Sequence, residues 1–222
     1  MMRDKDIILY MDNHLIVAHK AAGRLSQGDR TRDVSLLDLL KNKVADKFAK
    51  KGNIFVGLVH RLDRPVSGLM VFARTSKAAA RISKQIREHQ FKKSYMALVE
   101  GKTPACATWS DFLQRNGKKS QITIKNGKLA TLSFKRIGYT AGISLVEIQL
   151  DTGRHHQIRA QFAAKKYPIV GDTLYDATQQ WRRGEISLHS YRIVLQHPIS
   201  SEHLEFYSQI PSEWKRYLTE ND

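Results

Sequence analysis

The second half of the chain consists of short segments in which apolar and polar residues alternate. The change begins after Pro104, and turn dipeptides that contain glycine separate the segments. Alternation with a period of two places one set of side chains on each face of a strand, which is typical of antiparallel sheets. The tripeptide NGK occurs at 116–118 and at 126–128, and Asn-Gly favours tight hairpin turns. We therefore predict an antiparallel meander of the segments WSDFLQR (109–115), SQITIKN (120–126), LATLSFKRI (129–137) and ISLVEIQLD (143–151).

The first half mixes strand-length apolar runs with two amphipathic helices. Ser35 and Asp38 form a capping-box pattern, and apolar residues then recur every four positions up to Phe48, before KKGN (50–53) ends this helix. A second helix is predicted from Ser76 to about Gln90. Strands are predicted at 7–10, 14–20, 54–60, 68–74, 94–101, 186–195 and 203–208, and further helices at 154–166 and 211–218. This pattern predicts one α+β domain over residues 1–222, or two lobes that share one mixed sheet, with helices on the flanks.

The chain is strongly basic. Its 37 Lys and Arg residues outnumber 21 Asp and Glu residues, which gives a net charge of +16. Such an excess favours a polyanion as partner, above all a nucleic acid. A protein that is merely basic is the simple alternative, and a membrane surface ranks third because no amphipathic anchor or lipidation signal is present.

Cysteine content and targeting signals narrow the class of protein further. Cys106 is the single cysteine, which excludes an internal disulfide and a cysteine-based zinc site. The N-terminal sequence lacks the long apolar core of a signal peptide, and no segment is long enough to span a membrane. We therefore expect a cytoplasmic protein.

One carboxylate stands out in the segment VHRLDRPVSGLMVFAR (59–74). Asp63 lies among Arg61, Arg64 and Arg74, just before an apolar run. On this segment alone, a structural ion pair or a turn-forming role is the more common explanation. Nearby positive charge also keeps a partly buried carboxylate ionised, and an ionised carboxylate can attack a sugar carbon.

Three ordered blocks resemble the RluA-type pseudouridine synthase family. HRLDRPVSGLMVFAR (60–74) is similar to its His-Arg-Leu-Asp signature, FKKSYMALVEG (91–101) to its Lys-x-Tyr-x-Ala-x-Val-x-Gly strand, and LDTGRHHQIRAQFAAKKYPIVGDTLYD (150–176) to its Thr-Gly-Arg-x-His-Gln-Ile-Arg helix and following turn. The resemblance extends over nearly the whole chain. It implies the pseudouridine synthase fold, in which a long, bent, mostly antiparallel sheet carries a central active-site cleft.

The resemblance also implies an isomerase that converts uridine in ribosomal or transfer RNA to pseudouridine. The bond from N1 of uracil to the ribose breaks, the base turns, and C5 is joined to the ribose, without a metal or organic cofactor. The target base must leave its stack to enter a pocket. Whether the aspartate attacks the sugar or removes a sugar proton to form a glycal stays open.

Three residues match the catalytic positions of the family. Asp63 matches the catalytic aspartate, Arg154 the arginine that pairs with it, and Tyr95 the tyrosine that stacks on the base. A guanidinium would keep the carboxylate charged and oriented. The alternatives are a phosphate contact for Arg154 and an ordinary aromatic residue on a sheet face for Tyr95.

Four further residues are candidates for RNA contacts. They are Arg61, Arg64, His155 and Arg159. A salt bridge beside Asp63 is nearly as good an explanation for Arg61. The nine histidines include no HExxH or Cys/His spacing, and the adjacent pair His155 and His156 would diverge on a helix, so we expect no metal.

The chain departs from the family pattern at several positions. Val66 replaces the usual threonine, His155 a small Thr or Ser, and Ala21 the proline of a Lys-Pro-Ala-Gly turn. Many relatives also carry an N-terminal RNA-binding module that this sequence lacks, so we expect RNA selection to depend on the domain surface or on a partner. We expect a monomer. The rival hypothesis is a non-catalytic RNA-binding or ribosome-assembly protein with the same fold.

Overall fold

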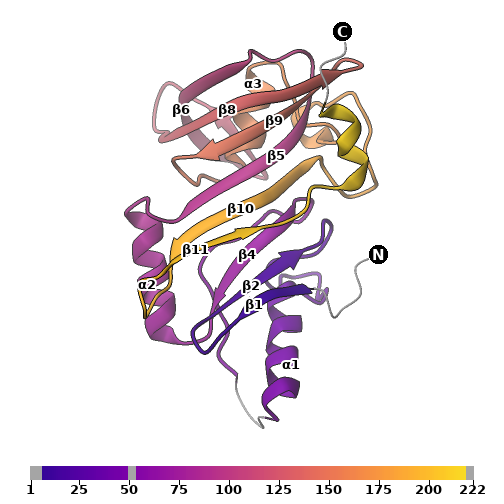
Figure 1. Ribbon diagram of the computed structural model, residues 1–222. Coiled ribbons are helices and arrows are strands. Elements are labelled where there is room, and N and C mark those ends of the chain that lie inside the picture. Colours follow the sequence, from indigo (N-terminus) through magenta and orange to yellow (C-terminus); the bar gives the residue numbers. More distant parts are fainter. Residues whose placement is uncertain (1–6, 50–53, 219–222) are drawn as a thin grey trace. The chain divides into compact units, whose positions relative to one another are not determined.

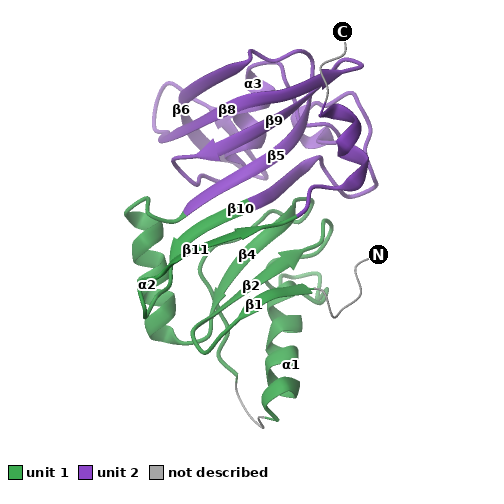
Figure 2. Cartoon of the chain, viewed as in Figure 1, with its two compact units in different colours: residues 1–91, 192–208 green, residues 92–191, 209–222 purple. Residues whose placement is uncertain are grey.

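The computed structural model describes residues 7–49 and 54–218, which group into two compact units. Unit 1 comprises residues 1–91 and 192–208, and unit 2 comprises residues 92–191 and 209–222 (Figure 2). The chain enters unit 2 after Phe91 and returns within a single strand, Leu188–Gln196 (β10). Residues 50–53, predicted to end the first helix, lie outside the described residues. The single domain over 1–222 stays a prediction.

Unit 1 is built on antiparallel strand pairs (Figure 1). Its second strand pairs with the first and with the fourth, and its last strand pairs with the final five residues of β10. The strands are β1 (Ile8–Met11), β2 (Leu15–Lys20), β3 (Gly57–Leu58), β4 (Ser67–Ala73) and β11 (His203–Tyr207). The predicted strands at 7–10, 14–20, 68–74 and 203–208 are thereby confirmed.

Two helices complete unit 1, and both begin where the sequence predicted. Ser35 caps α1 (Leu36–Phe48) with the full capping box, since Ser35 and Asp38 each bond to the other's backbone. Thr75 caps α2 (Ser76–Arg87). Ala78 and Ile82 of α2 belong to the same buried cluster as Leu69 and Val71 of β4. This packing holds the strand that follows Asp63.

The predicted strand at 54–60 is mostly wrong. Only β3 forms a ladder, pairing Gly57 with Ala73 and Leu58 with Phe72 of β4. Of the flanking residues, Val56 is buried, Phe55 is exposed, and the others are half-buried. The apolar run therefore reflects packing and not a continuous strand, and the chain leaves the sheet before it reaches Asp63.

Unit 2 contains an antiparallel sheet in the order β5-β9-β8-β6-β7. The strands are β5 (Lys92–Glu100), β6 (Cys106–Asn116), β7 (Lys119–Ile122), β8 (Lys128–Thr140) and β9 (Ile143–Leu150). The strands were predicted near these bounds, except that β7 ends at Ile122, before the predicted 126. Their order was predicted wrongly, because a meander would place β7 beside β8. Instead, β6 pairs with both β7 and β8.

The two NGK tripeptides therefore do different things. The first closes the β6–β7 hairpin, with Gly117 at φ +56°. The second connects strands that do not pair, so its prediction as a hairpin turn is wrong. A Cβ on Gly127 would lie 2.8 Å from the Cβ of Phe112 in β6. This glycine is needed for close packing against β6.

Three short helices lie in unit 2: α3 (Gln157–Ala164) and the 3₁₀ helices η2 (Thr173–Tyr175) and η3 (Ser212–Tyr217). The helix predicted at 154–166 is shorter than expected. His156 adopts a left-handed conformation at φ 51°, which interrupts the helix before Gln157. The helix predicted at 211–218 is a 3₁₀ helix that follows Pro211.

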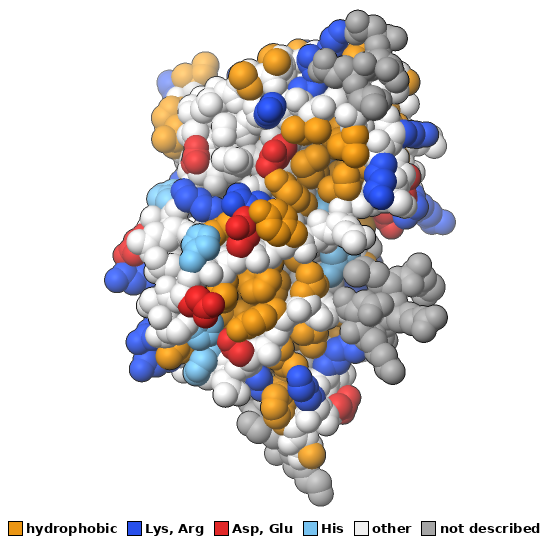
Figure 3. Space-filling model, viewed as in Figure 1, with side chains coloured by type: hydrophobic (Ala, Val, Ile, Leu, Met, Phe, Trp, Pro, Cys, Tyr) orange, Lys and Arg blue, Asp and Glu red, His pale blue; other side chains and the backbone are white. Residues whose placement is uncertain are grey.

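The predicted α+β class is confirmed by this mixture of antiparallel sheets and separate helices. The bend of the sheet and the central cleft stay predictions. Lys and Arg side chains are visible on the surfaces of both units in the view of Figure 3, as the net charge of +16 requires. No helix in the described part of the chain is long and apolar enough to cross a membrane.

Candidate active site

Asp63 lies in unit 1 in a short loop between β3 and β4. The backbone N–H of Val66 donates to the Asp63 carbonyl at 3.1 Å and closes a four-residue turn that contains Pro65. Asp63 itself is partly buried, between buried Leu62 and exposed Arg64. The loop therefore presents the carboxylate at the surface of a rigid strand, a common arrangement for reactive groups.

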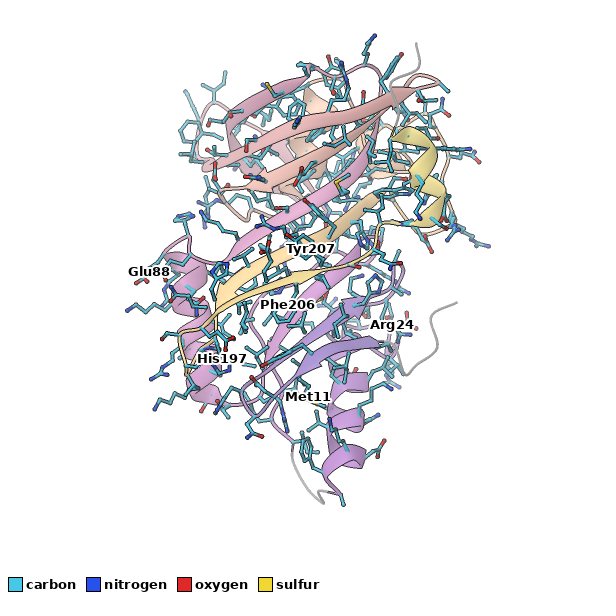
Figure 4. The ribbon with its side chains drawn as sticks, in the orientation of Figure 1. Met11, Arg24, Glu88, His197, Phe206 and Tyr207 are labelled. Atoms are coloured by element: carbon cyan, nitrogen blue, oxygen red, sulfur yellow. The ribbon has the colours of Figure 1, made fainter. Side chains whose placement is uncertain are left out.

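A buried lysine anchors the loop on one side of Asp63. The side chain of Lys20 is fully buried at the end of β2, and its Nζ donates to the Arg64 carbonyl at 3.1 Å. The same ammonium donates to the carbonyl oxygens of Arg24 at 2.8 Å and Ala21 at 3.2 Å. Arg24, labelled in Figure 4, lies on the turn that follows β2. Lys20 therefore ties this turn to the loop of Asp63.

A buried serine anchors the loop on the other side. Ser26 Oγ donates to the Leu62 carbonyl at 2.7 Å and accepts the Leu62 N–H at 3.2 Å. The backbone of the residue before Asp63 is thus fixed by Ser26, and that of the residue after it by Lys20. This double anchoring limits the positions that the carboxylate can take.

The charge of Lys20 is coupled to that of Asp63. Burial lowers the pKa of Lys20 to about 7, while the Asp63 carboxylate opposes this shift. Sequence reasoning overlooked Lys20 because it ends an apolar strand and resembles an ordinary surface lysine. A single lysine directly after the run HLIVAH was the available signal.

The two arginines that flank Asp63 differ in their environment. Arg64 Nη2 pairs with Asp33 at 2.7 Å, and its Nε donates to the Gly23 carbonyl at 3.0 Å. Its side chain is still 47% exposed. Arg61 is exposed and does not share these contacts. Both remain accessible to a phosphate.

Tyr95 and Arg154 lie in unit 2. Tyr95 is buried in β5, opposite Ile148 of β9. Arg154 is exposed just before α3, and its Nε donates to the Leu129 carbonyl at 2.9 Å. The unit thus brings Arg154 to the end of β8, while its remaining guanidinium nitrogens stay available for other partners.

Gln157 fixes the turn that carries Arg154. Its Oε1 accepts the Arg154 N–H at 3.0 Å and the Thr152 hydroxyl at 2.8 Å. Its Nε2 donates to the Thr131 carbonyl of β8 at 3.1 Å. Gln157 is buried, so these bonds are protected from water.

Arg159 has a structural environment that disfavours the predicted RNA contact. It is 5% exposed, and its Nε and Nη2 bind the two carboxylate oxygens of buried Asp172 at 2.6 and 2.7 Å. Its Nη1 lies 3.0 Å from Nε2 of His156. A guanidinium that is buried and bidentate has little surface left for a phosphate. The ion pair therefore ties α3 to Asp172 at the start of η2, and a contact of Arg159 with RNA stays a prediction.

His155 and His156 stack instead of diverging. Their ring centroids are 3.9 Å apart and nearly parallel, because the left-handed backbone of His156 turns the two side chains the same way. His155 Nδ1 lies 3.0 Å from Ser120 Oγ, and His156 Nδ1 lies 3.1 Å from the Tyr175 hydroxyl. In the described part of the chain, no three His, Cys, Asp or Glu residues are grouped so that they could hold a metal ion.

Comparisons with known proteins show the family and the fold of the chain. The family model described as RNA pseudouridylate synthase matches residues 14–164, a range that contains Asp63, Tyr95 and Arg154. The structures titled Human RNA Pseudouridylate Synthase Domain Containing 4 and 1 have the same fold, with TM-scores of 0.78 and 0.75 at 22% identity over 96% and 91% of this chain. This chain covers 92% and 82% of those two chains.

Curated relatives are similar over nearly the whole chain. The ribosomal large subunit pseudouridine synthase D of Zymomonas mobilis is 28% identical over 93% of this chain and 69% of its own length. The tRNA pseudouridine synthase C of Yersinia pestis is 29% identical over 96% of this chain and 90% of its own length. The protein named Uncharacterized RNA pseudouridine synthase YhcT, from Bacillus subtilis, is 30% identical over 94% of this chain and 70% of its own length. Across these and further relatives, this chain spans between 52% and 90% of the relative's length. The chain belongs to the RNA pseudouridylate synthase family, in its RluA-type branch.

Proposed function

We propose that this chain isomerises uridines in ribosomal or transfer RNA to pseudouridine without a cofactor. The ionised carboxylate of Asp63 is the catalytic group. The observation that carries the proposal is the family match over residues 14–164, which contains the three residues of the predicted site. The names of the relatives from Zymomonas mobilis and Yersinia pestis support ribosomal and transfer RNA as substrate classes.

The proposed reaction needs an ionised carboxylate beside the ribose. Asp63 would act at the sugar of the target nucleotide, and Arg154 would pair with it so that it stays charged and oriented. Tyr95 would stack on the extruded uracil. The double anchoring of the Asp63 loop by Lys20 and Ser26 supports this role, since a catalytic group must be held in place before substrate arrives.

We propose that three further residues predicted from the sequence bind RNA. Arg61, Arg64 and His155 are accessible or partly accessible and would contact the RNA backbone near the target nucleotide. We also propose a cytoplasmic monomer whose two units form one catalytic domain. Light scattering after size-exclusion chromatography checks the oligomeric state.

Replacing Asp63 by Asn tests the catalytic assignment. The recombinant protein is incubated with unmodified ribosomal and transfer RNA transcripts, and pseudouridine is quantified by mass spectrometry. We expect pseudouridine with the wild type, none with Asp63→Asn, and wild-type levels with Asp46→Asn, a matched change of an exposed aspartate on α1. Full activity of Asp63→Asn would refute the assignment.

Arg154→Lys tests the pairing role of the guanidinium. Lysine keeps the charge but loses bidentate geometry, so we expect the single-turnover rate to fall by about 10²-fold, with the fold retained. A wild-type rate in Arg154→Lys would contradict the pairing. The rival, a binding protein without catalysis, predicts tight RNA binding and no pseudouridine from the wild type.

A further inference from the structure

One cation of unit 2 has no role in the site described above. Lys93 lies at the start of β5, is partly buried, and is two residues before Tyr95. Side chains two positions apart on a strand project from the same face of the sheet. Lys93 and Tyr95 therefore share a face, and exposed Lys92 points to the opposite one.

The ammonium of Lys93 also lies beside the turn that carries Arg154. A methyl group placed on Gly153 would be 3.8 Å from Nζ of Lys93. This nitrogen therefore lies next to the backbone of Gly153, the residue directly before Arg154. Lys93 is thus close to two segments, β5 and the turn before α3, that each contribute a residue of the proposed site. The other titratable side chains of these segments include Lys92, Tyr95 and Glu100 in β5, and Asp151, Arg154 and His155 around the turn.

This cation is not used by the scaffold. Within residues 7–49 and 54–218, no hydrogen bond or ion pair engages the Lys93 ammonium. Burial lowers its pKa to about 8. A half-buried cation without an anion costs stability, and such groups concentrate where a substrate supplies the missing charge.

The reaction produces a suitable negative charge. When the bond from N1 of uracil to C1′ of the ribose breaks, its electron pair stays on the base, which becomes an anion with charge on N1, O2 and O4. We propose that Lys93 is a further catalytic residue that donates a hydrogen bond from its ammonium to a uracil oxygen and stabilises this anion. The proposal rests on the proposed function and adds a residue to it. Lys93 stays protonated while C5 forms the new bond to C1′ of the ribose, and C5 then releases its hydrogen as a proton to solvent.

Substitution at Lys93 tests the inference under single-turnover conditions. We expect Lys93→Met to lower the rate constant on uridine RNA by about 10²-fold, and to change RNA affinity by less than about threefold. Lys92→Met, the neighbouring exposed lysine, should keep the wild-type rate. A wild-type rate in Lys93→Met would overturn the inference.

A better leaving group distinguishes charge stabilisation from a structural effect. Fluorine at C5 stabilises the uracil anion, so breakage of the N1–C1′ bond in RNA with 5-fluorouridine at the target should depend less on the ammonium, and Lys93→Met should slow this step by only about tenfold. C5 of this nucleotide carries fluorine in place of hydrogen and has no proton to lose, so the rate compared on both RNAs is that of disappearance of the N1-linked nucleoside. An equal loss on uridine and on 5-fluorouridine would overturn the proposed role. The thermal unfolding of each variant is measured in parallel.

Lys93→Arg keeps the charge and tests the inference even if the methionine variant unfolds. We expect the wild-type rate constant to decline as the pH rises above about 8 and that of Lys93→Arg to stay level up to pH about 9.5, since arginine does not titrate there. The same decline in both proteins would overturn the inference. A wild type that leaves uridine unchanged overturns the proposed function as well, whereas an active wild type with an unaffected Lys93→Met overturns this inference alone.

Discussion

At the scale of single residues, Lys20 and Arg159 are buried cations with different partners. Lys20 has three carbonyl acceptors and the Asp63 carboxylate nearby, whereas Arg159 donates from two of its nitrogens to the two carboxylate oxygens of Asp172. Burial makes a charge costly unless partners compensate it. These partners place Lys20 beside the loop of Asp63 and Arg159 in an ion pair within unit 2.

Lys20→Met should change how stability depends on pH. The pKa of Lys20 is about 7 in the folded chain and near 10.5 when exposed in the unfolded chain. Between these values the unfolded state binds a proton that the folded state does not, so the contribution of Lys20 to the free energy of unfolding falls as pH drops from 10.5 to 7 and is constant below 7. Chemical denaturation at several pH values from 7 to 10 should show a shallower rise with pH in Lys20→Met. Identical slopes in both proteins would contradict this account.

Arg159→Met should be strongly destabilising because it leaves the buried Asp172 carboxylate without its partner. We expect a loss of roughly 3–5 kcal/mol in the free energy of unfolding. Arg182→Met is the matched control, since its ion pair with Glu213 involves an arginine side chain that is 65% exposed, and it should cost at most about 1 kcal/mol. Denaturation of both variants by urea measures the difference, and a loss as small as that of the control would show that Arg159 is not buried as described.

At the scale of elements, the turn between β1 and β2 depends on one aspartate. Asp12 Oδ1 accepts the N–H groups of His14 and Leu15 at 2.6 and 2.8 Å, and Oδ2 lies 2.9 Å from Nε2 of His197, which is labelled in Figure 4. Burial alone would raise the pKa of Asp12, but these bonds and the Tyr10 hydroxyl together lower it.

Asp12→Ala should therefore destabilise the chain mainly above pH 4. A carboxyl with a lowered pKa in the folded state contributes stability above its ordinary value of 3.8, and this contribution is lost as pH falls through the folded-state value. We expect a loss of about 1–3 kcal/mol at pH 7 and a smaller one at pH 3, measured by urea denaturation. A loss that is independent of pH would show that the carboxylate charge is not involved.

Some features of the helices and strands were predictable from the sequence, and others were not. The capping box at Ser35 and the alternation in β6, β8 and β9 are local signals, and the structure follows them. The order of β6, β7 and β8 depends on which strand edges pair with each other. Alternation of apolar and polar residues predicts a strand but not its neighbours in the sheet. The early end of the strand at 57–58 and the left-handed backbone of His156 also arise from tertiary packing.

The candidate site was predictable only where a motif named its residues. Asp63, Tyr95 and Arg154 follow from the resemblance, but the anchors Lys20 and Ser26 become visible only when the chain is folded, since they are 43 and 37 residues away from Asp63 in sequence. The ion pair of Arg159 with buried Asp172 was not predictable, because the position of Arg159 in the motif does not reveal this partner.

At the scale of the whole molecule, the net charge of +16 predicts RNA binding that weakens with salt. If Arg61 contacts a phosphate, Arg61→Ala should reduce the slope of log affinity against log salt concentration by about 0.7 for a single-stranded target, and should weaken binding similarly for different sequences. Fluorescence anisotropy of labelled RNA, measured at KCl concentrations from about 50 to about 300 mM, gives the slope. An unchanged slope would favour a structural salt bridge for Arg61.

If Asp63 is the catalytic residue, its carboxylate is required for pseudouridine formation in cells. The most direct measurement is a map of pseudouridines in ribosomal and transfer RNA from cells that lack the gene, complemented with the wild type or with Asp63→Asn. We predict at least one pseudouridine that disappears with the gene and returns only with the wild type. A site restored equally by Asp63→Asn would contradict the account.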